Sequence, residues 1–506
     1  MEFNTTLIFL LLTTITFFLL PLAMHRRKKS GNLPPSPSMT LPIIGNLHQL
    51  GPLPHRALAS LSTKHGPLIQ IRLGSFPAVV VSSAEMAEEV MKTQDLNFAT
   101  RPRSSIADLI LYGSRDIAFS PYGEHWRRMR KICVLHLLSN KRVQEFRSVR
   151  EEEVSLLLSN IRRASPSPVN LSGMLRNLLF DVISRLSFGK KLSEEEGATE
   201  MILESSMLLA AFPMKDFIPW LGWVDELRGL NQRVRKASAY FDAFFDPILD
   251  KHTHSAMGSV KQQAVNLIDV LMSLKEEEEE EDADLATLDR DCIKAFIWDM
   301  LSGGTDTTSA ALVWAMANLI KHPASMRRAQ AEVRRVVGFN STVAEEDISE
   351  MKYLDAVIKE TLRLYPSVPL LLPREAMKDT KLNGYDIPAG TRVLVNAWKI
   401  GRDNKYWDKP EEFYPERFLD KSFDFRGQDF QYIPFGAGRR GCPGITFGTI
   451  MIQYVLANLL HDFDWEIPKE MHNQVLDMTE ISTIELHKKT GLVLNAKPYS
   501  SSFSSI

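Results

Sequence analysis

The spacing of hydrophobic residues predicts a mainly helical protein. Residues 68–73 and 78–82 are β-rich runs separated by Gly74-Ser75-Phe76-Pro77, which is typical of a β-hairpin. Further along the chain, apolar residues recur every three or four positions, the spacing of amphipathic helices. A short β-rich run returns at residues 392–395. The predicted helices cover residues 85–93, 124–138, 140–162, 293–320, 323–337 and 351–364.

The first residues predict a membrane anchor. No charge lies between Glu2 and His25, and a helix from Phe3 to Met24 would rise about 33 Å, enough to cross a hydrocarbon core of about 30 Å. The basic cluster at 26–29 follows directly and, by the positive-inside rule, stays cytosolic. A cleaved signal peptide is the alternative, but no basic region precedes the run and no small-residue cleavage site precedes the basic cluster.

This pattern divides the chain into three parts. Residues 1–24 form the predicted transmembrane anchor, and residues 25–40 form a basic and proline-rich hinge. The run Leu33-Pro34-Pro35-Ser36-Pro37 cannot be helical, because proline fixes φ and restrains the residue before it. Residues 41–506 show no repeat and no second linker, so we expect one large domain there.

Composition narrows the class of protein. The chain has 506 residues, and 60 Lys and Arg face 62 Asp and Glu, for a formal net charge of −2. A nucleic-acid-binding protein normally shows a strong basic excess, so we expect no nucleic-acid partner. The three cysteines cannot form a disulfide framework, and none lies in a C-x-x-C pair. Any cysteine chemistry would therefore depend on a single thiol.

One cysteine has surroundings suited to chemistry. Residues 434–444 read Pro-Phe-Gly-Ala-Gly-Arg-Arg-Gly-Cys-Pro-Gly, and their glycines allow tight turns and close approach to a flat object. An apolar helical pattern begins after Gly444, and the positive end of that helix would favour a thiolate at Cys442. Phe435 can pack near the sulfur, and Arg440 can pair with an anion. Cys133 and Cys292 lack such surroundings and are expected to be buried hydrophobes.

This loop resembles the cytochrome P450 signature F-x-x-G-x-R-x-C-x-G. All five fixed positions match, at Phe435, Gly438, Arg440, Cys442 and Gly444. The resemblance implies a mainly α fold with small β-sheets, behind an N-terminal transmembrane helix. It also implies heme b (iron protoporphyrin IX) as cofactor, with the Cys442 thiolate as axial ligand of the iron. The phrases PPSP, LPIIGNLHQLG and PFGAGRRGCPG look most like those of plant microsomal members devoted to specialised metabolism.

Two further motifs fit the resemblance as structural and cofactor contacts. Glu360 and Arg363 share one helix face, and in the family such a pair joins a later arginine, here Arg417 in Pro-Glu-Arg-Phe, to brace the heme loop. The resemblance also implies that the heme propionates are bound by three residues upstream of the cysteine loop. These are Trp126, Arg130 and Arg374.

A third motif concerns proton delivery. Gly303 and Gly304 lie inside a predicted helix, where each costs about 1 kcal/mol relative to alanine. They indicate either close helix packing or a local distortion that opens room over a ligand. Asp306 and Thr307 follow, an acid next to a hydroxyl, and the resemblance implies that they pass protons to iron-bound dioxygen.

The resemblance implies a monooxygenase that inserts one atom of O₂ into a C–H bond. The chain has no dinucleotide-binding fingerprint of its own, so electrons would come from NADPH through a membrane-bound reductase. Localisation would be the endoplasmic reticulum membrane, single-pass, with a cytosolic catalytic domain. A basic patch is expected to bind the reductase, with candidates His125, Arg127, Arg128, Lys131, Lys141 and Arg142.

The expected substrate is a small, hydrophobic, uncharged molecule such as a terpenoid, phenolic, coumarin, oxime or alkaloid. Two alternatives stay open: oxidative desaturation, ring closure or rearrangement without net hydroxylation, and a heme sensor or carrier without turnover. The strand region 368–372 and the turn at 481–484 are expected to line the pocket. By family position, the candidate pocket residues are Ile106, Leu301, Gly304, Val368, Leu370 and Ile484.

Overall fold

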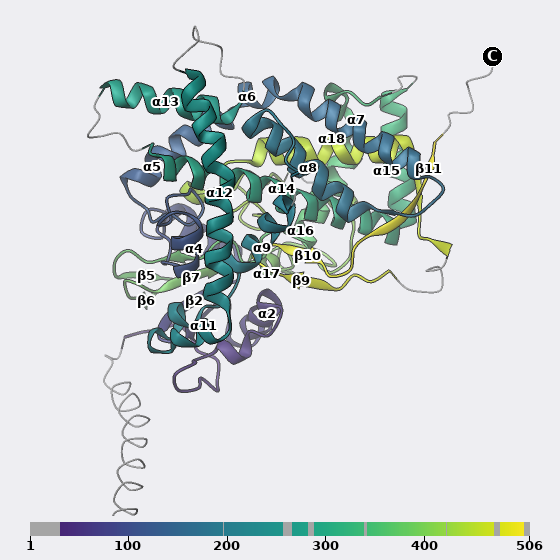
Figure 1. Ribbon diagram of the computed structural model, residues 1–506. Coiled ribbons are helices and arrows are strands. Elements are labelled where there is room, and N and C mark those ends of the chain that lie inside the picture. Colours follow the sequence, from purple (N-terminus) through teal and green to yellow (C-terminus); the bar gives the residue numbers. More distant parts are fainter. Residues whose placement is uncertain are drawn as a thin grey trace, which may run out of the picture.

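The computed structural model describes residues 31–195, 197–256, 266–281, 288–338, 342–420, 423–469 and 476–499. Helices dominate these residues, and the strands form one four-stranded sheet and three smaller sheets (Figure 1). The prediction of a mainly α fold with small β-sheets is confirmed. The predicted anchor at residues 1–24 lies outside the described residues. Within the described part of the chain, no helix is both long and apolar enough to span a bilayer.

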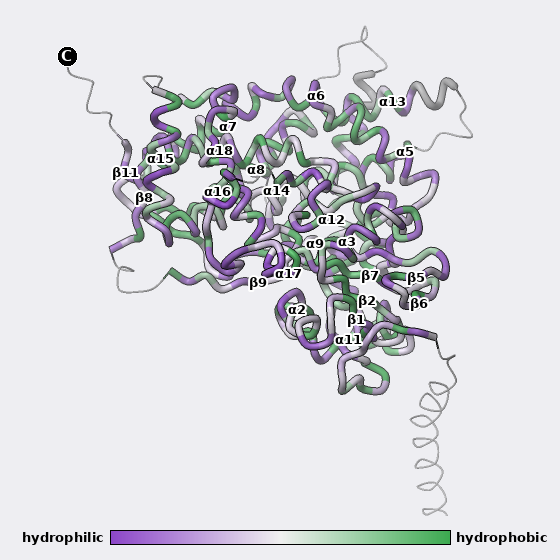
Figure 2. Tube along the Cα trace, turned by 180° about the vertical axis from the view of Figure 1, so that it is seen from behind, coloured by the Kyte–Doolittle hydropathy of each residue, from purple (hydrophilic) through white to green (hydrophobic). Residues whose placement is uncertain are grey.

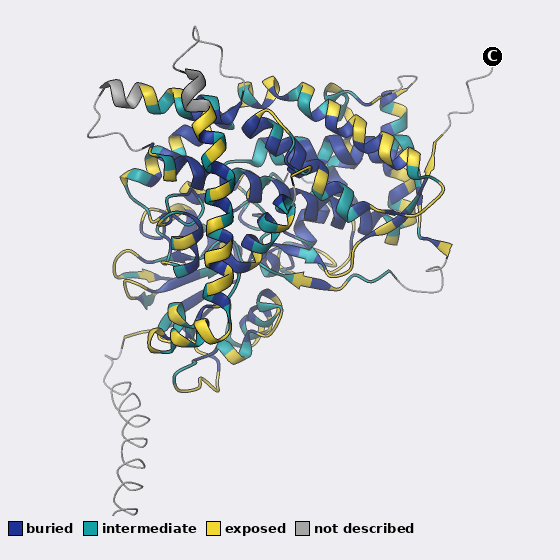
Figure 3. Ribbon diagram, in the orientation of Figure 1, coloured by how far each residue is buried: buried dark blue, intermediate teal, exposed yellow. Residues whose placement is uncertain are grey.

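The longest helix runs through the centre of the molecule. α14 (Arg290–Lys321) has 32 residues and is apolar on most sides, so nearly its whole surface is buried. Its N-terminus is capped by Asp289, whose Oδ1 accepts the Cys292 amide at 2.9 Å. It packs against α8 (Leu171–Phe188), α16 (Lys352–Leu364) and α18 (Ile445–Asp462), as the dark blue centre of Figure 3 shows.

The main sheet lies at the end of the molecule where the described chain begins. β1 (Leu68–Leu73) and β2 (Phe76–Val81) form the predicted hairpin, with Leu73 opposite Phe76. β7 (Arg392–Val395), also predicted, pairs with β2 in parallel, and β4 (Arg374–Glu375) completes the order β1-β2-β7-β4. Figure 2 shows this sheet beside α2 (Pro54–His65).

The predicted helices are present with shifted or divided boundaries. Residues 140–162 form two helices, α6 (Asn140–Glu145) and α7 (Arg147–Ala164), whereas α15 (Pro323–Val337) has the predicted bounds. Residues 85–93 and 124–138 each begin as an α-helix, α3 (Ala84–Glu88) and α5 (Glu124–Ile132), and end as a π-helix. Backbone hydrogen bonds to the carbonyls of Glu89 and Cys133 close these wider final turns.

The prediction of a strand at residues 368–372 is wrong. These residues form a turn, with the Leu371 amide bonded to the Val368 carbonyl at 3.1 Å. Proline at 366 and 369 limits the pairing of this segment, and Leu371 has a positive φ of 50° that no strand accommodates.

The proline-rich hinge follows the edge of the main sheet. From residue 31 to 37 it has no helix or strand, as the prolines predict. The Pro35 carbonyl accepts the Gln70 amide of β1 at 2.8 Å, and the Asn32 amide donates to Asp386 at 2.8 Å. Hydrogen bonds at Asn32 and Pro35 therefore fix the start of the described chain against the body.

Candidate active site

A large cavity of about 300 Å³ lies between α14 and the loop before α18. It is lined mostly by apolar side chains from α14, the segment before α5, the turn after α16 and the hairpin of β9 (Glu480–Ser482) and β10 (Leu486–Lys488). Ten predicted site residues are among its lining: Trp126, Arg130, Gly304, Thr307, Val368, Arg374, Phe435, Arg440, Cys442 and Ile484.

Cys442 faces this cavity from a tight loop. Its amide donates to the Phe435 carbonyl at 2.9 Å, which closes the loop, and α18 begins three residues later. Gly438 has a φ of 68°, and a side chain there would collide with the Met91 carbonyl. Cys442 lies deep in the protein, yet it is accessible because the cavity opens onto it. Burial raises the pKa of its thiol, so a stable thiolate needs a nearby cation such as a metal ion.

Four arginines converge on the cavity, and Arg374 has an ion pair with the buried Asp95 at 3.4 Å. Burial lowers the pKa of Arg440 to about 9 and that of Arg374 to about 10, and it lowers the pKa values of Arg101 and Arg130 as well. Repulsion from Arg440 and Arg374 lowers the pKa of Arg101 further, and repulsion from Arg374 and Arg130 lowers that of Arg440 further. Buried like charges are costly unless an anion neutralises them. The donor set therefore fits a ligand with more than one negative charge.

The same arginines donate to backbone carbonyls around the cavity. Arg440 bonds to the carbonyls of Ala99, Ile117 and Ser120, at 2.6 to 3.1 Å. Arg130 reaches the Gly441 carbonyl at 2.6 Å. The Trp126 indole also donates to the Ile117 carbonyl, at 3.1 Å, and its ring lies 4.2 Å from the Arg440 guanidinium carbon.

Arg374 and Arg101 also bond to backbone carbonyls near the cavity. Arg374 donates to the Ala437 carbonyl at 2.9 Å. Arg101 donates to the carbonyls of Ala118, Leu372 and Pro373 at 2.7 to 2.9 Å. These carbonyls hold the four side chains at the edge of the cavity.

The middle of α14 forms the opposite part of the lining. α14 is an unbroken helix, so the two glycines act through packing and space rather than through a break. A side chain at Gly304 would lie 2.7 Å from Ile183 of α8, whereas Gly303 has open space beside it. The Thr307 hydroxyl donates to the Gly303 carbonyl at 2.6 Å and faces the cavity.

Asp306 lies on another side of α14, outside the cavity lining, and belongs to a small polar network. Its carboxylate accepts the Ser206 hydroxyl at 3.1 Å, and Ser206 is 2.9 Å from the Ser302 hydroxyl. The Arg176 Nε atom is 3.7 Å from it. Burial raises the pKa of Asp306, and Arg176 partly opposes this. Ser206 and Ser302 line the cavity, so the network connects the acid to it.

Comparison with known proteins assigns this arrangement to a family. The sequence model described as "Cytochrome P450" matches residues 34–495. The chain belongs to the cytochrome P450 family. It is 51% identical over 506 residues to cytochrome P450 71A1 of Persea americana, covering 98% of this chain and 99% of the relative. It is therefore a plant-type P450 of the specialised-metabolism clan, an oxygen-incorporating oxidoreductase.

Two other relatives have more specific names. A Prunus mume protein named phenylacetaldehyde oxime monooxygenase is 47% identical, covering 92% of this chain and 89% of its own. A Strychnos protein named norfluorocurarine oxidase is 45% identical, covering 92% of each chain. A solved zebrafish cytochrome P450 structure with progesterone matches with a TM-score of 0.75 and 27% identity, over 88% of this chain and 99% of its own.

The cavity residues of this P450 fit heme b. A soft thiolate ligand at Cys442 suits the iron of heme, and four buried guanidiniums suit the two propionates. Gly436, Gly441 and Gly444 line the cavity without side chains, so this part of the loop leaves room for a flat ring. Family membership likewise implies O₂, a small-molecule substrate and electrons from NADPH through a reductase.

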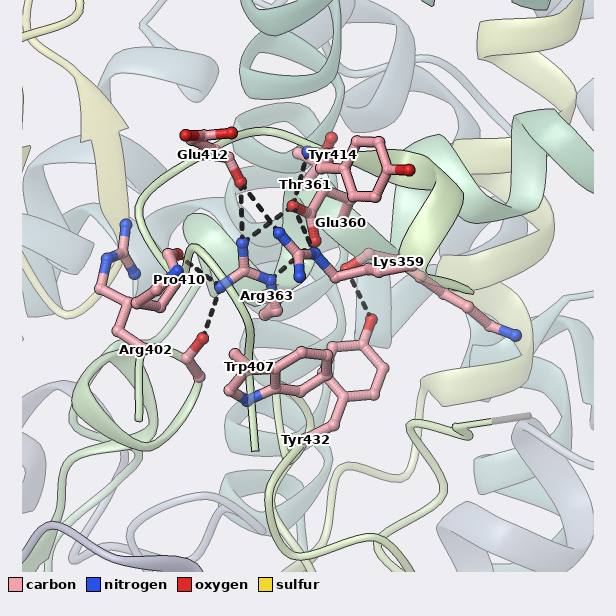
Figure 4. Close-up of polar contacts among 12 residues, drawn as sticks. Lys359, Glu360, Thr361, Arg363, Arg402, Trp407, Pro410, Glu412, Tyr414 and Tyr432 are labelled. Carbon is pink, nitrogen blue, oxygen red and sulfur yellow. Dashed lines mark hydrogen bonds and ion pairs between the residues drawn. The ribbon is translucent and has the colours of Figure 1, made fainter. Parts of the chain in front are cut away.

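Glu360 and Arg363 form a fully buried ion pair (Figure 4), and the partly buried Arg417 joins it. Arg363 donates to both Glu360 oxygens, at 2.7 and 2.8 Å, and Arg417 Nε reaches Oε1 at 3.1 Å. Arg363 also donates to the carbonyls of Gly401 and Pro410 at 2.7 Å. The cluster therefore ties α16 to the segment leading to the cysteine loop.

Three predicted pocket residues lie elsewhere. Leu301 and Ile106 are buried in the main hydrophobic core, and Leu370 packs beside the β1–β2 hairpin. None of them is among the residues that line the cavity. α14 is apolar all round, so the sequence alone does not say which of its faces looks into the cavity.

The sequence reasoning missed three charged residues of the lining. Arg101 completes the arginine group, Asp299 on α14 accepts the Ile117 amide at 2.6 Å, and Glu485 lies in the β9–β10 turn. Burial and the nearby Asp116 raise the pKa of Asp299. Asp299 and Glu485 each lie between apolar residues in the sequence, a signal that could have revealed them, whereas Arg101 lies between Thr100 and Pro102 and carries no such signal.

Proposed function

We propose that this P450 hydroxylates a small hydrophobic plant metabolite: a terpenoid, a phenolic or coumarin, an oxime or an alkaloid. The observation that carries the proposal is that one cavity joins Cys442 and the buried arginines to Thr307 and an apolar wall. An apolar wall binds the hydrocarbon part of a substrate and excludes water from the reacting carbon. The names of the Prunus and Strychnos relatives support the oxime and alkaloid classes.

The chain's own residues divide the work of the reaction. Heme b, when bound, supplies the activation of O₂ and the electron transfer that the side chains cannot supply. Cys442 would hold it as a thiolate, and the propionates would bind to Arg101, Arg130, Arg374 and Arg440. Overall, the substrate C–H and O₂ take up two electrons and two protons and give C–OH and water.

Proton supply depends on α14. The Thr307 hydroxyl uses its hydrogen to bond the Gly303 carbonyl, so its oxygen is available to accept a hydrogen bond from a water in the cavity. The raised pKa of Asp306 lets its carboxyl take up and release a proton closer to neutral pH than an exposed aspartate would. Ser206 and Ser302 would relay that proton towards the cavity through their hydroxyl groups.

We further propose that the protein is held at the endoplasmic reticulum membrane by residues 1–24, with the catalytic domain in the cytosol. Trp220, Trp223 and Leu227 are 50 to 77% exposed, in the segment that includes α11 (Trp223–Leu227). Both views place α11 at the end of the molecule where the described chain begins (Figures 1 and 2). Exposed aromatic residues are typical of surfaces that meet a membrane interface.

A turnover screen tests the substrate proposal. Microsomes that contain the chain and a reductase are given NADPH and a panel of terpenoids, phenolics, coumarins, oximes and alkaloids, and products are identified by mass spectrometry. A gain of one oxygen atom supports hydroxylation and identifies the class. Loss of two hydrogens would favour desaturation or ring closure instead. Absence of NADPH consumption with every compound would favour a sensor or carrier.

A further inference from the structure

Glu485 is a buried carboxylic acid in the wall of the active-site cavity. Its residue is 5% exposed and is among the cavity-lining residues. It lies at the end of the tight β9–β10 turn, where its amide and its carbonyl both bond to Thr483, at 3.2 and 2.9 Å. The turn therefore fixes the backbone from which this side chain extends.

Two hydrogen bonds link the Glu485 segment to Thr307. The Leu486 amide donates to the Ser367 carbonyl at 2.8 Å, and the Ser367 hydroxyl donates to the Thr307 carbonyl at 2.9 Å. Trp314 of α14 also donates to the Leu486 carbonyl, at 2.9 Å. These hydrogen bonds thus hold the Glu485 segment beside the part of α14 from which Thr307 faces the cavity.

Glu485 lacks the ion-pair partner that Asp306 and Glu360 have. Asp306 has Arg176 nearby, and Glu360 has two arginines. Among the described residues, Glu485 forms no ion pair, and its carboxylate accepts one side-chain hydrogen bond, from the Thr483 hydroxyl at 3.0 Å. Burial and the negative charge of Asp306 raise its pKa to about 7. A buried charge without a partner is unfavourable, and a ligand in the cavity can supply that partner.

We propose that Glu485 binds a protonated amine of the substrate, so that the natural substrate is a hydrophobic molecule with a basic nitrogen. The inference rests on the proposed function, and it replaces the expected uncharged substrate by one with a single cationic group. The cavity offers that cation the Glu485 carboxylate and the field of Asp306, and it offers the remaining hydrocarbon Val368, Ile484 and other apolar side chains.

Such an anchor also orients the substrate. Glu485 and Cys442 both line the cavity, and the turn that carries Glu485 is tied to α14 by the bonds described above. An amine bound to Glu485 therefore places the rest of the molecule at a fixed position along the cavity. The carbon attacked would be set by its distance from the nitrogen, as for any substrate held at a second point.

Two probes of equal shape test the proposal by binding to the heme-loaded protein. N,N-Dimethylphenethylamine carries the charge, and isopentylbenzene is its uncharged carbon isostere. Binding is followed by the shift of the Soret band at pH 8. We expect Glu485→Gln to weaken binding of the amine about tenfold to a hundredfold, the effect of one charge-assisted contact, and to leave isopentylbenzene unchanged. Glu485→Asp should keep part of the preference, and the control Asp477→Asn, a carboxyl outside the cavity lining, should keep all of it.

A pH series on the unaltered protein gives a second readout. With a pKa of about 7, the ionised fraction of Glu485 falls about tenfold between pH 8 and pH 6, while the amine stays protonated. Binding of the amine should weaken by the same factor, and Glu485→Gln should abolish this dependence. His487 of β10 stays neutral in this range, since burial and Arg176 lower its pKa to about 4. Asp306 keeps its place beside Arg176 in Glu485→Gln, so any pH dependence that it causes would remain in this variant.

Several results would overturn the inference. One is equal binding of the amine to both proteins, and another is equal weakening of both probes by Glu485→Gln. A Soret shift to longer wavelength, which indicates nitrogen bound to iron, would also contradict it if it persisted in the variant. The carbon monoxide band of a thiolate-ligated heme distinguishes failure of the proposed function from failure of this inference. If that band is absent, the proposed function fails; if it is present without an amine preference, only this inference fails.

Discussion

Arg130 of α5 donates a 2.6 Å hydrogen bond to the carbonyl of Gly441, the residue before Cys442. The inner face of α5 therefore helps to hold the cysteine loop in place. Its outer face carries Arg127 and Lys131, one turn apart and both exposed. Two members of the basic patch expected from the sequence are therefore exposed on the helix that contacts the cysteine loop.

The first prediction concerns electron transfer. The double substitution Arg127→Glu/Lys131→Glu should slow heme reduction by the reductase about tenfold at low salt, because it reverses the local field that steers the partner. The difference should shrink as salt screens it. Stopped-flow reduction measures the rate. Arg327→Glu/Arg335→Glu on α15 is the control, since it reverses two exposed charges elsewhere. Equal rates for both double variants would contradict a docking role for α5.

The second prediction concerns cofactor retention. Arg101→Gln should speed heme loss about tenfold to a hundredfold, because a hydrogen bond to a charged group is worth about 1.5–3 kcal/mol. Transfer of heme to apomyoglobin measures the rate. Arg103→Gln, two residues away and with an 82% exposed side chain, should leave it unchanged. A similar rate for the two variants would mean that Arg101 does not bind the propionates.

The third prediction concerns the buried ion pair of α16. Glu360→Gln should destabilise the protein by about 3–5 kcal/mol, because it leaves the Arg363 guanidinium buried without its counter-charge. Glu88→Gln breaks the surface pair with Lys92 and should cost less than about 1 kcal/mol. Thermal unfolding compares the two variants. If Glu360→Gln unfolded at the same temperature as Glu88→Gln, the cluster would not brace the cysteine loop.

The fourth prediction concerns proton delivery. Thr307→Ala removes the hydroxyl that faces the cavity, so a larger share of NADPH oxidation should yield hydrogen peroxide instead of product. Ser309→Ala is the matched control, because its hydroxyl bonds the Asp306 carbonyl away from the cavity lining. Peroxide and product are measured per NADPH consumed. An unchanged ratio in Thr307→Ala would exclude Thr307 from the proton path.

The fifth prediction concerns pH and stability. Burial raises the pKa of Asp116 to about 6 from an ordinary 3.8, so the folded protein binds more protons than the unfolded chain between these values. Unfolding free energy should therefore fall by about 3 kcal/mol as pH rises through this range. Asp116→Asn should remove that fall, because asparagine does not ionise. Its side-chain carbonyl can still accept the hydrogen bond from the Phe119 amide, so the local contact is kept. Denaturation at pH 5 and pH 8, between which about 1.4 kcal/mol of the fall is expected, compares the two proteins, and identical pH dependence would contradict this origin.

Local sequence signals predicted much of this molecule, whereas long-range packing did not follow from them. Cys442 and its loop lie in eleven contiguous residues, and Glu360 and Arg363 are one helical turn apart, so their patterns were readable. Arg101 and Glu485 lie 384 residues apart and line one cavity through tertiary packing. The strand expected at 368–372 failed because two prolines and the positive φ of Leu371 override its apolar composition.

The central claim is that this P450 inserts an atom of molecular oxygen into its substrate. The most direct test is turnover under ¹⁸O₂ in ordinary water, with NADPH, reductase and the compound selected in the substrate screen. The account predicts a product that contains one ¹⁸O atom and is absent with Cys442→Ala. An oxygen atom taken from water, or a product without added oxygen, would contradict it.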